Sequence, residues 1–398
     1  MRSLSADGSA ETELLVSCAR TRLDAEHAEG MTALLEHGID QDRLIRMAGP
    51  HGLLPLLYWH LGAIGPGVVS SAMLSRLREH FEANARRNLF LTAELLKVLR
   101  LLEASEIPAV PFKGPLLAAS TYGNLSLRQF ADLDILVRKD DVPKAKELLI
   151  SRGYRPPLAL TGAQDAALLR SQSEYVFSSR DGKVVVELHW RFAPAYFSSP
   201  LDLDRLWDRL RWISLGGVQV RSLGPEDLLL VLCVHGSKHC WERLEWICGI
   251  AEVVRTQPTL DWPRVIEEAA REGSVRMLFL GLLLADQLLG APIPEEVLRR
   301  ARRDSGAQAL AAEVRARLFR GTQRAPGMLE TTWFHLRARE RLADRIRYCL
   351  RLALSPTVGD FELVSLPATL YFLYYVLRPI RLARKYGSRR ARAVTREC

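Results

Sequence analysis

The sequence has 398 residues, of which 48% are hydrophobic and 25% are charged. This is ordinary usage for a globular protein and excludes a disordered, collagen-like or coiled-coil chain. Six cysteines without a CxxC pair exclude a disulfide scaffold, and the opening residues lack the apolar core of a signal peptide. We therefore expect a cytoplasmic protein with reduced thiols, built from about two to three domains.

The net charge of +9 is concentrated at the C-terminal end. Residues 366–398 contain eight basic residues and one acidic residue, which is seven of the nine net positive charges. The rest of the chain is close to neutral, so no general nucleic-acid-binding surface is indicated.

The first part of the chain has helical periodicity. Residues 1–12 are small and polar, which predicts a disordered N-terminus. Residues 13–106 have the pattern of helices, the last of them a long amphipathic helix over about 71–107. Prolines in the extended run 107–112 then limit it to an edge strand or to the start of a strand.

A helix and a central strand follow this edge strand. Lys113-Gly114-Pro115 begins a short helix that continues to about Tyr122, because proline suits the first helical turn. Asp132–Val137 alternates acidic and apolar residues before becoming fully apolar, which predicts a central strand. Asp140 is expected to cap the next helix, which ends near Gly153.

Two more strands are expected before the pattern becomes helical again. Glu174–Ser179 and Lys183–Trp190 flank Asp181-Gly182, a strong hairpin signal. Residues beyond about 200 are mainly helical in pattern.

These patterns predict an α+β protein, with a small mixed β-sheet unit embedded in predominantly helical N- and C-terminal segments. The expected segments are a disordered start (1–12), a helical region (13–106), an α/β core (107–200), a second helical region (201–360) and an apolar-aromatic helix with a basic tail (361–398).

Three acidic residues on the predicted strands are the candidate catalytic and metal-binding groups. Asp132 and Asp134 are two residues apart on one strand, so their side chains leave the same face. Glu187 lies within an otherwise apolar strand, where an acid is costly unless it is paired or bound to a metal. Three such acids on neighbouring strands would form a two-metal clamp for in-line phosphoryl chemistry, and oxygen ligands suit Mg²⁺. The alternative is that Asp132 caps a turn and the other two pair with arginines.

Lys113 and Gly114 precede the helix that leads to this strand. Glycine lets a phosphate approach the backbone, and lysine adds a mobile positive charge near the free N–H groups of the helix start. A plain turn with a solvated lysine is the alternative interpretation.

Several runs together resemble one known family. They are Phe112-Lys113-Gly114-Pro115-Leu116-Leu117, Leu127 to Val137 around Asp132 and Asp134, Glu187-Leu188-His189-Trp190, His235 to Trp241 with Leu244 and Trp246, and Leu377 to Leu382. This set resembles the uncharacterised bacterial nucleotidyltransferase family of the polymerase-β-like superfamily. The resemblance spans most of the chain and is strongest between residues 112 and 250.

The resemblance implies a nucleotidyltransferase core with a short mixed sheet. In such a core, a pair of acids and a third acid from another strand bind the metal that holds a nucleoside triphosphate. Three positions depart from the wider superfamily. Lys113-Gly114 replaces a Gly-Ser pair, Ala131 stands where serine is frequent before the first aspartate, and Cys248-Gly249 stands where relatives tend to carry an aspartate. The last departure puts in doubt any role taken over for that acid.

Other polar residues are candidates for phosphate or acceptor binding. Arg128 lies at the strand entry, where it binds a triphosphate or pairs with Asp132. Lys238 and His239 are expected to reach toward the phosphates or the acceptor. His235 and His239 are four residues apart on one helical face, a spacing that also occurs in zinc sites, although the HExxH pattern is absent.

Residues 363–377 carry no charge and contain four aromatic residues. The segment is too short to span a bilayer. It is a core helix followed by a solvated tail, or an interfacial anchor on anionic lipid, so a peripheral membrane contact is one of the expected alternatives. A third alternative is that the basic end binds an acidic peptide or RNA.

The leading hypothesis is a Mg²⁺-dependent transferase that uses two metal ions to move a nucleoside monophosphate from an NTP to an acceptor hydroxyl or phosphate. The acceptor is a small molecule, a peptide or a protein. One alternative, favoured by Ala131 and Gly249, is a nucleotide-binding protein with weakened catalysis. Another is transfer of a different group to a natural product or peptide.

Overall fold

The computed structural model describes residues 9–64, 67–158, 160–194, 196–197, 203–320, 326–364, 366, 370 and 373–382. Its N-terminal helices are α1 (Ala10–Cys18), α2 (Ala25–Glu36), α3 (Gln41–Ala48), α4 (Leu54–Ile64) and α5 (Ser71–Glu103). The α/β part contains β1 (Ala109–Pro111), α6 (Gly114–Ser120), η1 (Leu125–Leu127), β2 (Asp132–Val137), η2 (Lys139–Asp141), α7 (Val142–Ser151), α8 (Gly162–Ser171), β3 (Glu174–Ser178) and β4 (Val185–His189).

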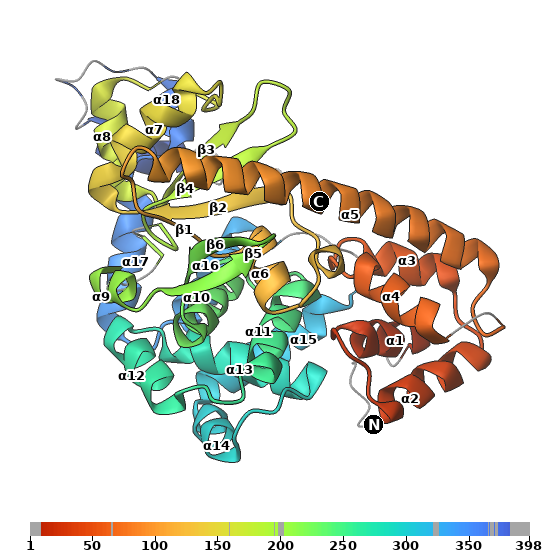
Figure 1. Cartoon of the computed structure of the whole chain (residues 1–398). Helices are drawn as coiled ribbons and strands as arrows, with labels where there is room; N and C mark the ends of the chain where they lie inside the picture. Colours follow the sequence, from red (N-terminus) through yellow and green to blue (C-terminus); the bar gives the residue numbers. More distant parts are fainter. Residues whose placement is uncertain are drawn as a thin grey trace, which may run out of the picture.

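The C-terminal half begins with α9 (Leu203–Asp208), β5 (Arg211–Leu215) and β6 (Val218–Ser222). The helices that follow are α10 (Pro225–Lys238), α11 (Leu244–Thr256), α12 (Trp262–Glu272), α13 (Val275–Leu289), α14 (Glu295–Arg303), α15 (Ser305–Leu318), α16 (Met328–Arg337), α17 (Leu342–Leu354) and α18 (Val358–Leu363). The predicted α+β class is confirmed, with a small mixed sheet in a mainly helical chain (Figure 1).

The sheet has four strands in the order β1-β2-β4-β3. β2 and β4 are parallel neighbours in its centre, and β1 and β3 flank them in antiparallel orientation. The proline-containing strand β1 lies at an edge of this sheet, where the missing N–H of Pro111 is tolerated.

Each face of the sheet packs into a different hydrophobic core. Leu133 and Ile135 point toward Leu91 and Leu95 of α5, which runs along the sheet in Figure 1. Leu136 belongs to the other core, which contains both the N-terminal helices and the helices α10–α15. The face that bears Leu136 also bears Asp132 and Asp134, because alternate residues of a strand share a face.

A second, two-stranded sheet was not expected. β5 and β6 pair in antiparallel register around Gly216 and Gly217, whose φ angles of +58° and +80° are those of a tight hairpin turn. The prediction that the chain is helical beyond residue 200 is therefore wrong for this segment.

Two predicted helix boundaries also differ in the structure. Asp140 does not cap α7, because residues 139–141 first form the short 3-10 helix η2 and α7 begins at Val142. At the N-terminus, residues 1–8 lie outside the described residues. Residues 10–12 belong to α1, which Ser9 caps by accepting a hydrogen bond from the Thr12 N–H, so the disordered start is wrong for these three.

The predicted apolar-aromatic helix is not one helix within the described residues. α18 ends at Leu363, and a separate helix covers residues 374–382. Tyr374 is fully buried, donates a hydrogen bond to the Val364 carbonyl and packs edge-on against Phe361. Most of the basic tail, residues 383–398, lies outside the described residues. No helix in the described ranges has the length and apolarity needed to cross a membrane.

Candidate functional site

The central strand pair brings the predicted acidic residues together. Asp134 of β2 lies directly opposite Glu187 of β4 in the parallel register, and Asp132 lies opposite Val185. Since Asp132 precedes Asp134 by two residues, all three carboxylates share one face of the sheet. Asp134 is buried, whereas Asp132 and Glu187 are partly exposed.

Lys113 provides a positive charge beside these acids. Its Nζ lies 2.8 Å from Oδ1 of Asp134, and the two side chains are 13% and 2% exposed. Lys113 is the residue directly before α6, and Gly114 follows it with a φ of +50°. A Cβ on Gly114 would lie 3.2 Å from the Asp132 carbonyl oxygen, so glycine lets this turn pack against the start of β2.

His189 is buried and lies close to three acidic side chains of the site. Its Nε2 lies 3.2 Å from Asp134 Oδ1 and 3.3 Å from Glu187 Oε2, and its Nδ1 lies 3.2 Å from Glu174 Oε2. None of these contacts has hydrogen-bond geometry. Both nitrogens of the imidazole therefore lie within ion-pair distance of carboxylates, three in all.

The two aspartates have opposite electrostatic surroundings. Burial raises the pKa of Asp134, but Lys113 and His189 oppose this effect and hold its pKa below the usual value. Burial and the charges of Asp134 and Glu187 raise the pKa of Asp132 to about 6. Although burial lowers the pKa of His189, contacts with Asp134 and Glu187 raise it to about 9.

A metal ion would find a suitable donor set here. Asp134, Glu187 and His189 each offer a ligand atom, and these atoms lie within 4.8 Å of one another. Asp132 is not part of this tight group, so the structure adds a histidine to the predicted acids. Three carboxylates gathered on one face of the sheet are oxygen donors of the kind that suits an additional cation.

The predicted phosphate-binding residues line the same region from other elements. Arg128 lies between η1 and β2, its Nη1 is buried without a hydrogen-bond partner, and its charge lowers the pKa of Asp132. Lys238, the last residue of α10, has its Nζ 4.0 Å from Glu174 Oε2.

His239 follows directly on α10 as its C-cap. Its ring centroid lies 4.6 Å from that of His235 and 5.3 Å from that of Trp246. Burial, followed by the charges of Lys238 and Lys113, lowers the pKa of His239 to about 3. Among the described residues, this histidine pair does not belong to a group that could hold a metal, so the zinc alternative has no third ligand.

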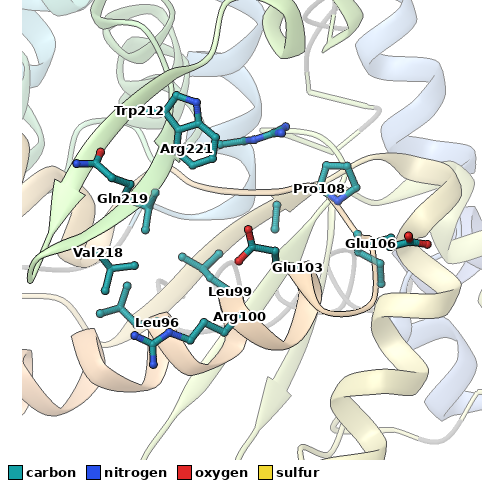
Figure 2. A pocket seen from close by; sticks show the side chains of 13 residues that line it. Leu96, Leu99, Arg100, Glu103, Glu106, Pro108, Trp212, Val218, Gln219 and Arg221 are labelled. Carbon is teal, nitrogen blue, oxygen red and sulfur yellow. The ribbon is translucent and has the colours of Figure 1, made fainter.

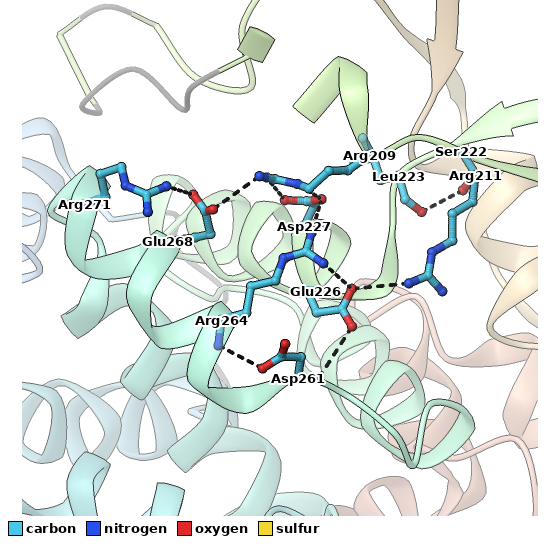
Figure 3. A network of polar contacts seen from close by, with 10 residues as sticks. All are labelled: Arg209, Arg211, Ser222, Leu223, Glu226, Asp227, Asp261, Arg264, Glu268 and Arg271. Atoms are coloured by element: carbon cyan, nitrogen blue, oxygen red, sulfur yellow. Dashed lines mark hydrogen bonds and ion pairs between the residues drawn. The ribbon is translucent and has the colours of Figure 1, made fainter. Parts of the chain in front are cut away.

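An ion-pair network fixes the start of α10, the helix that carries Lys238 at its end. Asp227 accepts from Arg209 at 2.6 Å and from Arg264 at 3.5 Å, and Arg209 also reaches Glu268 at 3.2 Å (Figure 3). Because several partners hold each charge, this network anchors α10 against α12 and the segment after α9.

A groove on another part of the molecule is not part of this site. It lies between α5 and the β5–β6 hairpin and is lined by Leu99, Trp212 and Arg221 among others (Figure 2). Ala109, which also lines it, pairs with Val137 and so shares the sheet face opposite to Asp134. The groove and the carboxylates are therefore on different faces of the sheet.

Glu174 is a site residue that the sequence analysis missed. It lies directly opposite His189 in the antiparallel β3–β4 pair. The hairpin register would have revealed it, because the cross-strand partner of a site histidine shares its face.

Comparison with known proteins gives the class of the chain. Residues 37–290 match the model of a family described as uncharacterised nucleotidyltransferase. The matched segment is more than half of the chain and contains the sheet and its acids. The chain belongs to this family, which makes it a nucleotidyltransferase enzyme.

Two solved structures are similar to parts of the chain at low identity. One is the solution structure of the antibiotic-resistance factor ANT(2'')-Ia, with 13% identity, a TM-score of 0.28 and coverage of 57% of this chain and 96% of that one. The other is an antigenic nucleotidyltransferase-like protein from Paracoccidioides brasiliensis, with 17% identity, a TM-score of 0.31 and coverage of 54% and 96%. No curated protein matches the sequence. The family match alone carries the assignment.

Proposed function

We propose that this chain moves a nucleoside monophosphate from an NTP to an acceptor hydroxyl or phosphate at a Mg²⁺ site held by Asp132, Asp134 and Glu187. The observation that carries the proposal is the register of β2 and β4, which sets Asp134 opposite Glu187 with Asp132 on the same face. His189 lies 3.2–3.3 Å from two of these acids.

The chain's own residues would bind and orient the substrates. Arg128 and Lys238 would bind triphosphate oxygens through their positive charges. Lys113 would interact with both Asp134 and the phosphates. His239, kept neutral at the end of α10, would contact the nucleotide or the acceptor. The acceptor oxygen bonds to the α-phosphorus and a hydroxyl acceptor releases its proton to solvent. The bond between the α-phosphorus and the α–β bridging oxygen breaks, and pyrophosphate leaves with that electron pair.

His189 acts as a positioning residue in this proposal. It contacts Asp134, Glu187 and Glu174 from one buried ring, so it holds the carboxylates of β2, β4 and β3 in place. Bound Mg²⁺, one ion or two, would neutralise charge that develops on the transferred phosphoryl group and the leaving pyrophosphate.

The test is pyrophosphate release from each of the four NTPs with Mg²⁺, in the presence of small-molecule and peptide acceptor mixtures. Asp134→Asn and Glu187→Gln should each reduce release at least about a hundredfold, because each removes a charge from the metal site. Asp181→Asn, the same change in the exposed β3–β4 turn, is the control and should leave release unchanged. Full release by both site variants would contradict the proposal.

A nucleotide-binding protein with weakened catalysis is the second candidate, favoured by Ala131 and Gly249 in place of polar residues. It predicts NTP binding by calorimetry that Lys113→Ala weakens, without pyrophosphate release for any acceptor. Transfer of a different group would appear as an acceptor mass shift that does not equal a nucleoside monophosphate.

A further inference from the structure

Helix α17 presents its apolar side to the solvent. Leu342, Ile346, Leu350 and Leu354 are 68%, 53%, 56% and 42% exposed. They follow each other at intervals of four, so they form one stripe along the helix, here called the α17 face. A helix at the surface of a globular protein normally turns such a stripe toward the core.

The opposite side of α17 attaches the helix to the protein. Tyr348 is its only buried residue, and its hydroxyl lies 3.0 Å from Nδ1 of His335 in α16. The Arg339 guanidinium lies 4.2 Å from the centre of the Tyr348 ring. These contacts attach α17 to the protein and fix which side of the helix faces outward.

A neighbouring helix also exposes apolar side chains. Nε of Arg378, in the helix over residues 374–382, donates to the Leu352 carbonyl of α17 at 3.0 Å. Val376 and Ile380 of that helix are 57% and 47% exposed, again four residues apart. Two connected helices thus expose apolar side chains.

Positive charge surrounds the α17 face. Residues 341–354 contain four arginines and one acid, Asp344, which pairs with Arg347. Arg341 and Arg345 donate to the backbone carbonyls of Ala270 and Arg339, which satisfies hydrogen bonds without neutralising charge. The stripe is therefore apolar at its centre and cationic at its margins.

These features favour an anionic lipid surface over a second copy of the chain. A 13-residue helix is about 20 Å long and about 10 Å wide, so the stripe falls well below the ~800 Å² per partner of a stable interface. Two copies would also bring arginines together. An interfacial helix, in contrast, combines an apolar stripe with arginines beside it, which bind anionic headgroups.

We propose that the α17 face binds the surface of anionic membranes, with its leucine and isoleucine side chains inserted at the headgroup boundary. This inference goes beyond the proposed reaction and does not depend on it.

The experiment is co-sedimentation of the full chain with vesicles of phosphatidylcholine containing phosphatidylserine, and with vesicles of phosphatidylcholine alone. We expect binding to the anionic vesicles that weakens as salt rises, because added ions screen the arginines. The double substitution Ile346→Glu/Leu350→Glu should weaken binding at least about tenfold, because it places charges where apolar side chains would insert into the membrane. Leu89→Glu/Phe90→Glu is the matched control on exposed positions of α5 and should bind normally.

A variant that ends at residue 382 separates the α17 face from the basic tail. It should keep vesicle binding, and adding Ile346→Glu/Leu350→Glu to it should still weaken that binding. Three results would overturn the proposal: no binding of the full chain at low salt, equal loss in the α5 control, or complete loss on removing residues 383–398. A dimer that Ile346→Glu/Leu350→Glu dissociates, without vesicle binding, would assign the face to a second copy instead. Circular dichroism melting confirms that each variant is folded.

Discussion

Asp132 and Asp134 are two positions apart in the sequence, but the charges that surround their carboxylates differ strongly. Asp134 has Lys113 at 2.8 Å and His189 at 3.2 Å, so its carboxylate is compensated although it is buried. Burial raises the pKa of Asp132 from 3.8 to about 6, and the negative charges of Asp134 and Glu187 add to this effect. Removing the charge should therefore have opposite effects at the two positions.

Asp132→Asn should stabilise the metal-free protein at pH 8 by about 2 kcal/mol. A carboxyl whose folded pKa is raised opposes folding above that pKa and has no such effect below its unfolded pKa. The gain should therefore decline as the pH falls through about 6 and vanish near pH 4. Urea unfolding in EDTA across this range measures it.

Asp134→Asn is the comparison and should lower the free energy of unfolding by ~3 kcal/mol at pH 8, because it leaves Lys113 buried without a counter-charge. If both asparagine variants shift stability in the same direction, the assignment of compensated and uncompensated aspartates is wrong.

Lys113 and Asp134 should be strongly coupled in a double-mutant cycle. Lys113→Met and Asp134→Asn each strand one buried charge, whereas the double variant removes both. We expect the double variant to be ~1–3 kcal/mol more stable than the sum of the single effects, measured by urea unfolding. Additive effects would mean that solvent or another group compensates each charge alone.

Strand alternation was sufficient to place Asp132 and Asp134 on one face, whereas the position of Glu187 depends on the register between β2 and β4. The position of Lys113 beside Asp134 depends on the turn before α6, and the contact between Glu174 and Lys238 joins β3 to the end of α10. Such contacts between distant segments have no local pattern, so sequence could suggest the residue types without predicting their pairing.

The turn after α10 is the element that orients Lys238 and His239. Cys240 and Trp241 both have positive φ angles, near +53° and +55°, which are costly for residues with a side chain. The buried Trp241 ring fills the space beside two glycines, Gly236 of α10 and Gly281 of α13. Packing of this ring against the glycines holds the turn in place.

Gly236→Ala should destabilise the protein by ~1–3 kcal/mol and weaken nucleotide binding, because its Cβ would lie 2.5 Å from the Trp241 ring. Gly249→Ala is the matched control within α11, where no atom lies within 4 Å of the new Cβ. This control should stabilise by up to ~1 kcal/mol through helix propensity. Thermal melting and nucleotide calorimetry measure both, and equal melting temperatures would contradict the packing argument.

Elements with strong local signals were predicted and those with weak signals were not. The long helix α5, the edge strand β1, the strand β2 and the β3–β4 hairpin follow from periodicity, prolines and an Asp-Gly turn. The β5–β6 hairpin was missed although Gly216-Gly217 stands between alternating residues, because its strands are mostly exposed and lack an apolar run. Residues 139–141 show a similar limit, since a 3-10 turn before a helix shifts the cap.

Across the whole molecule, the four-stranded sheet separates two cores that recruit distant segments. Helices from the N-terminal region and helices from the C-terminal region share the core on the carboxylate face. The core behind the sheet is completed by Phe361 and Tyr374, from the end of the chain. Sequence patterns identified these residues as apolar but could not assign them to a face, because that assignment depends on contacts across more than two hundred residues, such as that of Tyr374 with Gln164.

The chain end should therefore contribute to stability up to residue 382 but not beyond it. Truncation after Asp360 removes Tyr374 from the core and leaves the buried Asp360 without Arg378, whose Nη1 lies 2.9 Å away. We expect this truncation to cost at least ~3 kcal/mol of unfolding free energy, from the lost aromatic ring and the broken buried pair.

Truncation after residue 382 is the matched control, because it keeps Tyr374 and Arg378 and removes only residues 383–398. Its free energy of unfolding should remain within ~0.5 kcal/mol of the full chain, because the contacts of Tyr374 and Arg378 are retained. Urea unfolding followed by tryptophan fluorescence compares the three chains. If the chain truncated after Asp360 were as stable as the full chain, residues 361–382 would not belong to the core. The sheet would then need another cover on the face that packs against α5. If instead truncation after residue 382 destabilised the protein, residues 383–398 would contribute to stability as well.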